Sequence, residues 1–530
     1  MRITLSHRRI SGSCAWIGVV AFVLLTAAAC GPSNGASASR DILVTGASIL
    51  DGTGGPPQVA DVRIRDGRIL AVSDPGTLTP GPDEAVVDAQ GLVLAPGFID
   101  THSHHGGGLE EDPSALAAVS QGITTIVVGQ DGGSAFPLAE LFGELEAAPV
   151  AVNVGSYSGH NTLRREVLGE DFRRPATDGE IDEMRALLAE DLRAGALGLS
   201  TGLEYDPGIY SETEEVIALA QEAARYGGRY SSHMRSEDRA LWEALEELIQ
   251  VGREARIPVH VSHMKLAMRS LWGRAGEAIA RMDSARAEGI SLTADVYPYE
   301  YWQSTMTVLL PERDFSDRSA FQFALDELVP PEGFLIARFD PQPEYVGLTL
   351  DSIARLRDTD PTSAYMELVS EVEALRAETG EGGESIIGTS MSPEDIVTLL
   401  TWPHTNVSSD GGINGRHPRG TGTFTRILGR YVREEGFFSL QEAVHKMTYQ
   451  AAMNAGISER GLLRPGFRAD LVLFDPETVL DNATPEDPQA ISTGISRVWV
   501  NGVEVFTNGA ATGNRPGMVI RGSAYTRPGE

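Results

Sequence analysis

The sequence predicts an α/β fold: a TIM (β/α)8 barrel with a small β-sandwich domain built from both chain ends and an insertion between strands 7 and 8. Three observations lead to this prediction. Short apolar strands alternate with helical stretches through the middle of the chain, both ends carry alternating apolar and polar residues around hairpin turns, and one connection between strands is far longer than the others.

The first 29 residues have the pattern of a secretory signal peptide. Arg2, Arg8 and Arg9 precede an apolar segment from Ala15 to Ala29. A run of about 15 apolar residues is too short for a membrane span, which needs about 20. We therefore expect an exported protein.

The end of this segment resembles a bacterial lipoprotein box, with Cys30 as the lipidated first residue, although Ala27 stands where leucine is commoner. Simple secretion and a retained anchor are the alternatives. Residues 30–39 are rich in glycine and serine, which predicts a flexible tether. The expected location is the periplasm or the outer surface, with contact to a membrane only through the N-terminal lipid.

Composition excludes several classes of partner and site. The formal charge of −31 should repel nucleic acid and anionic lipid. The only two cysteines, Cys14 and Cys30, lie in the leader region, so the processed chain has no disulfide and no thiolate ligand for a metal. Lysine is limited to Lys265 and Lys446.

Residues 40–95 and 465–530 have the same strand pattern and should form one β-sandwich. Alternating segments flank Asp66-Gly67 near the start and Asn501-Gly502 near the end, and both dipeptides are typical of tight hairpin turns.

Residues 96–464 are interpreted as the barrel. A (β/α)8 barrel needs eight strands, each followed by a helix. The expected strands are Phe98 to His102, Thr124 to Gly129, Val150 to Gly155, Leu197 to Thr201, Gly228 to His233, Val259 to His263, Ser291 to Tyr297 and Asn406 to Ser409.

The seventh and eighth strands are separated by extra residues from about 302 to 401, which include helical stretches. We expect an insertion above the C-terminal rim of the barrel. Our hypothesis is that it acts as a lid; a purely stabilising appendage is the alternative.

Two histidines stand two residues apart at the end of the first predicted strand. Side chains alternate along a strand, so His102 and His104 should point the same way, into the barrel mouth where barrel enzymes keep their chemistry. His233, His263 and Asp410 occupy the ends of the fifth, sixth and eighth strands. These five side chains should converge and bind a divalent metal.

The same positions carry a family resemblance. PGFIDTHSH, the two later histidines and the Asp-Gly of strand eight resemble the amidohydrolase superfamily, whose barrels bind one or two divalent metals. GALGLSTGLEYDPG, SSHMRSED, VSHMK, HPRGTGTFTRILGRYV and GLLRPGFRADLVLFDP resemble the N-acyl-D-amino-acid deacylase (D-aminoacylase) family. The match runs from about residue 40 to 510 and is least clear in the insertion.

The resemblance implies that His233 and His263 hold the tighter metal, most simply zinc, and that His102, His104 and Asp410 form a second site. Members of the family commonly have a cysteine after strand two, where this chain has Asp131. A carboxylate can bind or bridge zinc, but it suits Mn or Co about as well. The alternative for Asp131 is a loop-turn residue before Gly132.

Strand four has no lysine, which argues against the carboxylated-lysine bridge of dihydroorotases and hydantoinases. Lys265 is the one lysine near the predicted site. It is expected to have an electrostatic role there, with a structural ion pair as the alternative.

Metal and carboxylate together predict amide hydrolysis. Zinc lowers the pKa of bound water toward about 7 and polarises the amide carbonyl. Asp410 can accept the proton of that water and pass it to the leaving nitrogen.

The resemblance implies that Arg419 binds the substrate carboxylate and that Tyr205 is its hydrogen-bonding partner. Arg235 and His160 are further candidates for contact with substrate. A structural or surface role is the alternative for each of the four.

The expected function is metal-dependent deacylation of an N-acyl amino acid, a small molecule, giving a carboxylate and a free amino acid. The D configuration comes only from the resemblance. A dipeptidase or cyclic-amide hydrolase of the same superfamily is the first alternative. A non-catalytic surface lipoprotein that binds a ligand is the second.

Overall fold

The computed structural model describes residues 41–380 and 382–526. The predicted signal peptide, the tether and Cys30 lie outside the described residues. Within the described part, no helix is both long and apolar enough to cross a membrane.

Both chain ends contribute strands to one small β domain, as predicted. The antiparallel pair of β5 and β18 joins them, with Val93 opposite Phe474 and Pro96 opposite Leu471. Apolar side chains from strands of both ends, including Ile64 and Trp499, pack in one core cluster, so the sheet must curl around them. Its strands are β1 (Ile42–Ile49), β2 (Gln58–Arg65), β3 (Arg68–Ser73), β4 (Ala85–Asp88), β5 (Val93–Pro96), β18 (Leu471–Phe474), β19 (Ile495–Val500), β20 (Val503–Thr507) and β21 (Ala510–Ala511).

The two predicted hairpin turns are present in this domain. Asp66 and Gly67 have φ of 51° and 72°, and Asn501 and Gly502 have φ of 49° and 77°. Two successive residues with positive φ define the type I′ turn, whose twist suits a two-residue hairpin. The turns connect β2 to β3 and β19 to β20.

Eight parallel strands build the barrel, and each overlaps a predicted strand. They are β6 (Phe98–Asp100), β7 (Ile123–Val128), β8 (Asn153–Ser156) with its extension β9 (Ser158–Gly159), β10 (Gly198–Gly202), β11 (Arg229–His233), β12 (Val259–Val261), β13 (Leu292–Val296) and β17 (Thr405–Val407). The last strand meets the first where the amide of Asp410 donates to the carbonyl of His102 at 2.8 Å. The ends of β17 and β6 are therefore adjacent.

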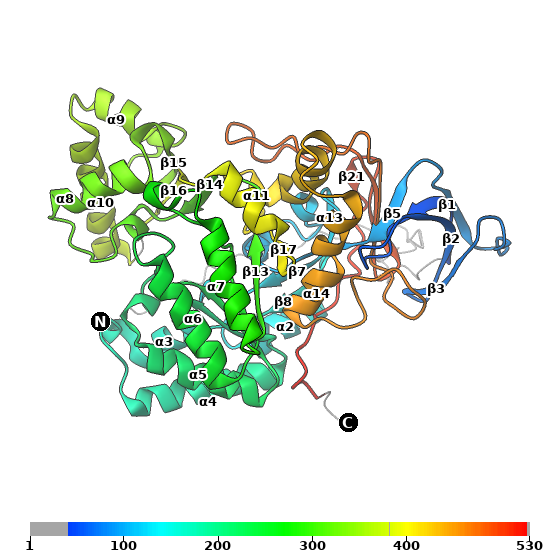
Figure 1. Cartoon of the computed structure of the whole chain (residues 1–530), viewed down its shortest axis with the longest axis horizontal. Coiled ribbons are helices and arrows are strands. Elements are labelled where there is room, and N and C mark those ends of the chain that lie inside the picture. The colour runs from blue at the N-terminus through cyan, green and yellow to red at the C-terminus, as the bar shows by residue number, and fades with distance from the viewer. Residues whose placement is uncertain (1–40, 381, 527–530) are drawn as a thin grey trace, which may run out of the picture. The chain divides into compact units, whose positions relative to one another are not determined.

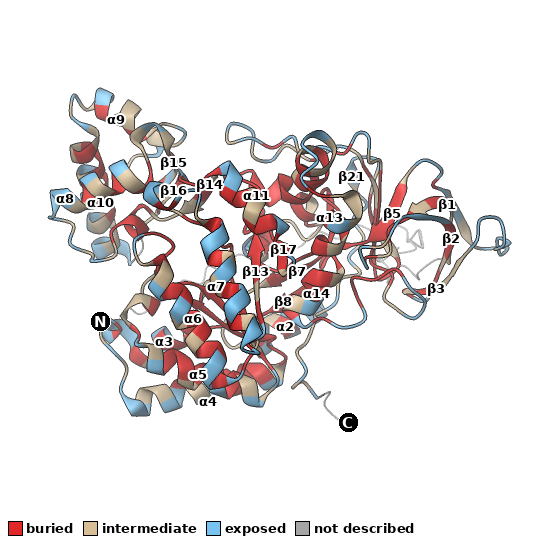
Figure 2. Ribbon diagram, in the orientation of Figure 1, coloured by how far each residue is buried: buried red, intermediate tan, exposed pale blue. Residues whose placement is uncertain are grey.

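Helices cover the outside of the barrel strands (Figure 1). In α6, the residues Leu241, Leu245, Leu248 and Gly252 are buried, which is the i, i+4, i+7 spacing of an amphipathic helix. Figure 2 shows exposed residues along α7, whereas the barrel strands that the helices cover are buried. The helices outside the insertion are α1 (Leu116–Val119), α2 (Leu138–Ala147), α3 (His160–Leu168), α4 (Asp178–Ala194), α5 (Thr213–Arg225), α6 (Leu241–Ala255), α7 (Ala275–Ala287), α11 (Pro393–Thr401), α12 (Arg419–Arg426), α13 (Leu440–Met447) and α14 (Tyr449–Ala455).

The insertion between β13 and β17 has its own small core. The ring of Tyr365 lies 4.8 Å from that of Phe321 and 5.0 Å from that of Phe334, measured between centroids. Its elements are the antiparallel strands β14 (Tyr301–Ser304), β15 (Phe334–Phe339) and β16 (Glu384–Thr389) and the helices α8 (Arg318–Phe323), α9 (Leu350–Leu356) and α10 (Pro361–Thr379).

The predicted end of the insertion, at about residue 401, is one helix too late. α11 packs against α7, β13 and β17, so it belongs to the barrel wall. From the sequence, α11 could not be assigned to the barrel wall, because its partners there are distant along the chain. Only the packing separates it from the insertion helices.

Candidate metal centre

All six predicted ligands lie just beyond the C-terminal ends of barrel strands. His102 and His104 follow β6, Asp131 follows β7, His233 ends β11, and His263 and Asp410 follow β12 and β17. Asp131, His263 and Asp410 have positive φ of 54°, 35° and 49°. Such a conformation is strained for these residues and is characteristic of functional sites.

The first strand is shorter than predicted, because β6 ends at Asp100. His102 and His104 are therefore brought together by the turn after the strand and not by strand alternation. They still point to one place, since the Nε2 atom of each lies 3.2 Å from Asp131 Oδ2. The predicted convergence is present, although its geometric reason was wrong.

A first group of ligand atoms surrounds Asp131 Oδ2. Asp410 Oδ1 lies 3.2 Å from His104 Nε2 and 3.6 Å from His102 Nε2. His102, His104, Asp131 and Asp410 thus bring four potential ligand atoms within 4.8 Å of one another.

A second group meets the other oxygen of Asp131. His263 Nε2 lies 3.3 Å from Asp131 Oδ1 and 3.1 Å from His233 Nδ1. Asp131, His233 and His263 again place their ligand atoms within 4.8 Å. One carboxylate therefore faces both groups, with a different oxygen directed at each.

These separations fit a metal coordination sphere. Ligands about 2.0 Å from a tetrahedral zinc ion lie about 3.3 Å from each other. Most of the contacts above are between 3.1 and 3.3 Å. Imidazole and carboxylate are also donors that zinc, manganese and cobalt accept.

The charges of the centre favour cation binding. Burial lowers the pKa of His104, but Asp131 and Asp410 outweigh this effect and raise it to about 10. Burial raises the pKa of Asp131, yet His102 and His263 bring it well below its usual value. His104 therefore holds its proton tightly between the two carboxylates, and metal binding at this position must displace that proton.

Three carboxylates behind the ligands were not identified from the sequence. Glu204 Oε2 accepts from His233 Nε2 at 3.0 Å, and Glu237 Oε1 lies 3.0 Å from His263 Nδ1. Asp295 Oδ1 accepts from the backbone amide of His263, and its other oxygen is 3.9 Å from His102 Nδ1. Carboxylates that contact the second nitrogen of a histidine fix its ring orientation and raise its basicity.

Lys265 takes part in a buried ion pair. Its Nζ lies 2.6 and 2.7 Å from the two oxygens of Glu237 and 2.8 Å from His263 Nδ1. Lys265 and Glu237 both line the central cavity. The two alternatives for Lys265 are thus both present: it forms an ion pair, and that pair contacts a predicted metal ligand.

Arg419 lies beside Asp410 at the cavity wall. Its Nη1 is 2.8 Å from Asp410 Oδ2, and its guanidinium stacks on the ring of Tyr297 at 4.7 Å. The Nε atom is buried and has no hydrogen-bond partner among the described residues.

The predicted contact of Tyr205 with the substrate carboxylate stays a prediction, although the tyrosine does not pack on Arg419. The tyrosine against Arg419 is Tyr297, which the sequence analysis did not select. Tyr205 lies over His233, with 4.4 Å between ring centroids, and its hydroxyl accepts from Ser304. It still lines the cavity, on the side of the second ligand group.

His160 and Arg235 have structural partners and do not line the cavity. His160 Nε2 lies 2.7 Å from Glu215, which also pairs with buried Arg164. Arg235 makes two contacts of 2.8 and 2.9 Å with Glu247. The prediction that they contact substrate is wrong, because neighbouring helices hold both side chains away from the centre.

A cavity of about 580 Å³ opens above the ligands, which is large enough for a small organic substrate. Barrel residues form its floor. The insertion contributes to its wall the residues Trp302, Gln303, Ser304, Thr305, Val308, Leu309, Leu328 and Ser385. The insertion therefore covers one side of the centre.

Comparison with known proteins shows which families the chain resembles. The model of the amidohydrolase family matches residues 85–287 and 395–506. The N-acyl-D-aspartate deacylase of Alcaligenes xylosoxydans xylosoxydans is 39% identical over 92% of this chain and 96% of its own length. The D-aminoacylase of the same organism is 36% identical over 91% of this chain and 98% of its own.

A solved structure agrees with these sequence matches. The N-acyl-D-glutamate deacylase from Bordetella bronchiseptica, complexed with zinc and a phosphonate inhibitor that mimics the tetrahedral intermediate, superposes with a TM-score of 0.81. It is 36% identical, and the match covers 91% of this chain and all of the other.

Proposed function

The chain belongs to the amidohydrolase family and, within it, to the N-acyl-D-amino-acid deacylases, and from this membership we propose that it hydrolyses the amide bond of N-acyl-D-amino acids at a divalent-metal centre. The products are a carboxylate and a free amino acid. The observation that carries the proposal is the convergence of four histidines and two aspartates at strand ends, with Arg419 beside them.

Zinc is the expected ion, held by His233, His263 and Asp131, with His102, His104, Asp131 and Asp410 able to hold a second. A bound ion acts as a Lewis acid on the amide carbonyl and lowers the pKa of a water molecule. The protein's own groups provide the remaining chemistry.

Asp410 is the proposed general base. Its Oδ1 faces the histidines and its Oδ2 faces Arg419, so it borders both the ligand group and the cavity. Burial raises its pKa, but Arg419 and the histidines bring it well below the usual value. Asp410 therefore stays ionised, accepts the proton of the attacking water and then donates it to the leaving nitrogen.

Arg419 is the proposed site for the α-carboxylate of the substrate. A guanidinium has five donors, and here one contacts Asp410, another lies 3.4 Å from the carbonyl of Gln303, and the buried Nε is free among the described residues. A carboxylate can use such donors as a bidentate partner.

The reaction is tested by amine release from N-acetyl D- and L-amino acids by the metal-loaded, leaderless protein. We expect release from D substrates, with little from L substrates, dipeptides and hydantoins. Release only from dipeptides or cyclic amides would transfer the assignment to another hydrolase activity. Tight binding of all these compounds without product would indicate a non-catalytic binding protein.

Replacement of Arg419 by methionine should lower kcat/KM for N-acetyl-D-leucine by about 10- to 100-fold, since a hydrogen bond to a charged group contributes about 1.5 to 3 kcal/mol. The α-amide of the same substrate, which lacks the carboxylate, should lose much less. Steady-state kinetics with both substrates checks this. An equal loss for both would mean that Arg419 acts on Asp410 and not on the substrate.

The location proposed for the protein is the periplasm or outer surface, with Cys30 carrying the lipid. Support comes from the sequence of the leader, which lies outside the described residues. Mass spectrometry of the N-terminal peptide from cells should find a diacylated Cys30. In the Cys30→Ala protein the lipid and the membrane association should both be lost. If the mature N-terminus of the wild type carries no lipid, simple secretion is favoured.

A further inference from the structure

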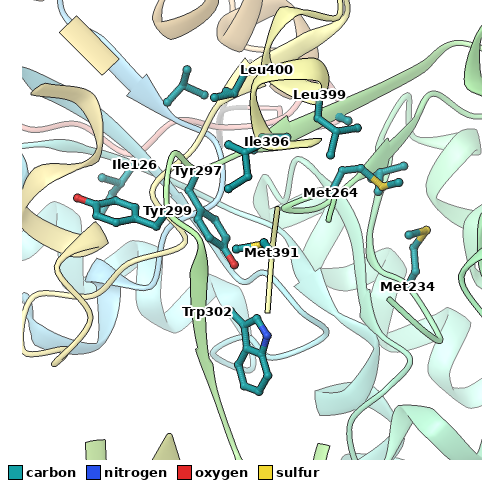
Figure 3. Close-up of a cluster of buried hydrophobic side chains, with 14 of the residues drawn as sticks. Ile126, Met234, Met264, Tyr297, Tyr299, Trp302, Met391, Ile396, Leu399 and Leu400 are labelled. Atoms are coloured by element: carbon teal, nitrogen blue, oxygen red, sulfur yellow. The ribbon is translucent and has the colours of Figure 1, made fainter. Parts of the chain in front are cut away.

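An apolar wall lines the cavity on the side of the insertion. It consists of Trp302, Val308, Leu309 and Leu328, which are 8%, 7%, 5% and 2% exposed. Figure 3 shows Trp302 and Tyr297 among the methionines and aliphatic residues of the adjoining core. Trp302 is fixed in place because its Nε1 donates to Ser390 Oγ at 2.6 Å.

This wall begins next to the proposed carboxylate site. Gln303, whose carbonyl faces Arg419, follows Trp302 directly on β14. In an N-acyl amino acid the carboxylate and the side chain are attached to the same carbon atom. A substrate held by Arg419 would therefore present its side chain to Trp302 and the neighbouring apolar residues.

Among the described residues that line the cavity, no arginine or lysine is left for a second carboxylate. Apart from histidines, the lining cations are Arg419 and Lys265, and both oxygens of Glu237 already neutralise Lys265. Five acidic residues line the same cavity: Asp131, Glu204, Glu237, Asp238 and Asp410. A substrate with an acidic side chain would bury an unpaired carboxylate there, which is unfavourable.

Two arginines flank the segment of Val308 and Leu309, but each is occupied outside the cavity. Arg239 contacts the carbonyl of Leu309 and Asp238, and its guanidinium stacks on Phe323 at 4.7 Å. Arg313 donates to the carbonyls of Thr307 and Glu204 and pairs with Asp206. Neither lines the cavity.

From these contacts we infer that the wall is the side-chain subsite and that the enzyme prefers N-acyl-D-amino acids with neutral, apolar side chains. This inference rests on the proposed function and specifies its substrate class. Although the similar relatives include deacylases named for aspartate and glutamate derivatives, this chain should discriminate against both.

The test compares kcat/KM for N-acetyl-D-leucine and N-acetyl-D-glutamate, with the acetyl group held constant. We expect the leucine derivative to be favoured by at least about 100-fold, the scale of discrimination that a mismatched pocket provides. In the Leu309→Arg variant this ratio should fall at least about tenfold, because the new guanidinium can pair with the glutamate carboxylate.

Two further variants make the result specific. Leu356→Arg adds the same charge at a position in the insertion that is 68% exposed, and it should leave the ratio unchanged. Leu309→Ala should lower kcat/KM for N-acetyl-D-leucine more than for N-acetyl-D-alanine. The inference would be overturned if the wild type preferred N-acetyl-D-glutamate. It would also be overturned if the variants at Leu309 changed the preference for the acyl chain and not the preference for the amino-acid side chain.

Calorimetry with the metal-loaded wild type separates this inference from the proposed reaction. Selective binding of N-acetyl-D-leucine without turnover would overturn the proposed function and support the subsite. Equal binding of the leucine and glutamate derivatives would overturn the subsite, whatever the rate of hydrolysis.

Discussion

Asp410→Asn protein should retain its fold and metal and lose at least 10²- to 10⁴-fold in kcat, roughly the contribution of a positioned general base. Asparagine keeps the size of the side chain and one ligand oxygen, but it cannot accept the proton. The histidines and Asp131 would still hold an ion, since they form the whole of the second ligand group and the rest of the first. The readouts are amine release from N-acetyl-D-leucine and metal content by mass spectrometry.

The control for this variant is Asp88→Asn, at an exposed aspartate on β4 in the small β domain that does not line the cavity. It should have wild-type kcat and metal content. A loss below about tenfold in Asp410→Asn, with metal still bound, would show that another group accepts the proton. A loss that follows metal content alone would mean that Asp410 is only a ligand.

The pH dependence supplies a second criterion. The folded-state pKa of Asp410 lies below its ordinary value, so the carboxylate contributes stability above the unfolded pKa, and this contribution disappears as the pH falls through the folded one. In Asp410→Asn protein this acid-dependent part of the stability should be absent. Denaturant unfolding at neutral and acidic pH would measure the difference.

The ligands and the strands could be predicted from the sequence because both depend on local pattern. A histidine or aspartate at the C-terminal end of a barrel strand is a candidate for the barrel mouth, where barrel enzymes keep their chemistry. His233 and Asp410 were found in this way. The carboxylates that support these ligands could not be predicted in this way. Glu204 reaches His233 from the end of another strand, and Asp295 lies inside β13.

The errors have the same physical origin. His160 comes directly after β9 and His233 ends β11, so the two look alike in the sequence. Only the contact of His160 with Glu215 on α5 shows that it is held away from the centre. Tyr297 was missed because it follows β13 in a tyrosine-rich segment, and nothing in the sequence distinguishes it from the tyrosines beside it. Its contact with Arg419 joins positions 122 residues apart, which local pattern does not reveal.

Asp131 shows how a single departure from the family pattern can be accommodated. A thiolate in this place would offer a single sulfur atom, whereas this carboxylate presents a separate oxygen to each group of ligand atoms. Its positive φ and the turn at Gly132 direct it inward, so the turn and the ligand are compatible roles. The carboxylate is harder than a thiolate, which should broaden the choice of metal.

Replacing Asp131 by alanine should therefore weaken zinc binding by at least about 100-fold, since loss of an outer partner alone costs about 10- to 100-fold. Both ligand groups lose an oxygen in this variant, so the unfolding temperature should no longer respond to added zinc as it does in the wild type. Equilibrium dialysis with mass spectrometry gives the affinity without reference to activity, and Asp88→Ala is the matched control.

Asp131→Cys decides between a ligand and a turn residue at this position. If Asp131 is a ligand, the cysteine variant should recover zinc binding that alanine loses and should bind zinc over manganese at least about tenfold more selectively than the wild type, because thiolate prefers the softer ion. Competition dialysis with equal concentrations of the two metals measures this ratio. If the alanine variant keeps its zinc affinity and all three proteins show the same ratio of zinc to manganese, Asp131 only shapes the loop. The two histidine pairs would then have to bind their ions without a shared carboxylate.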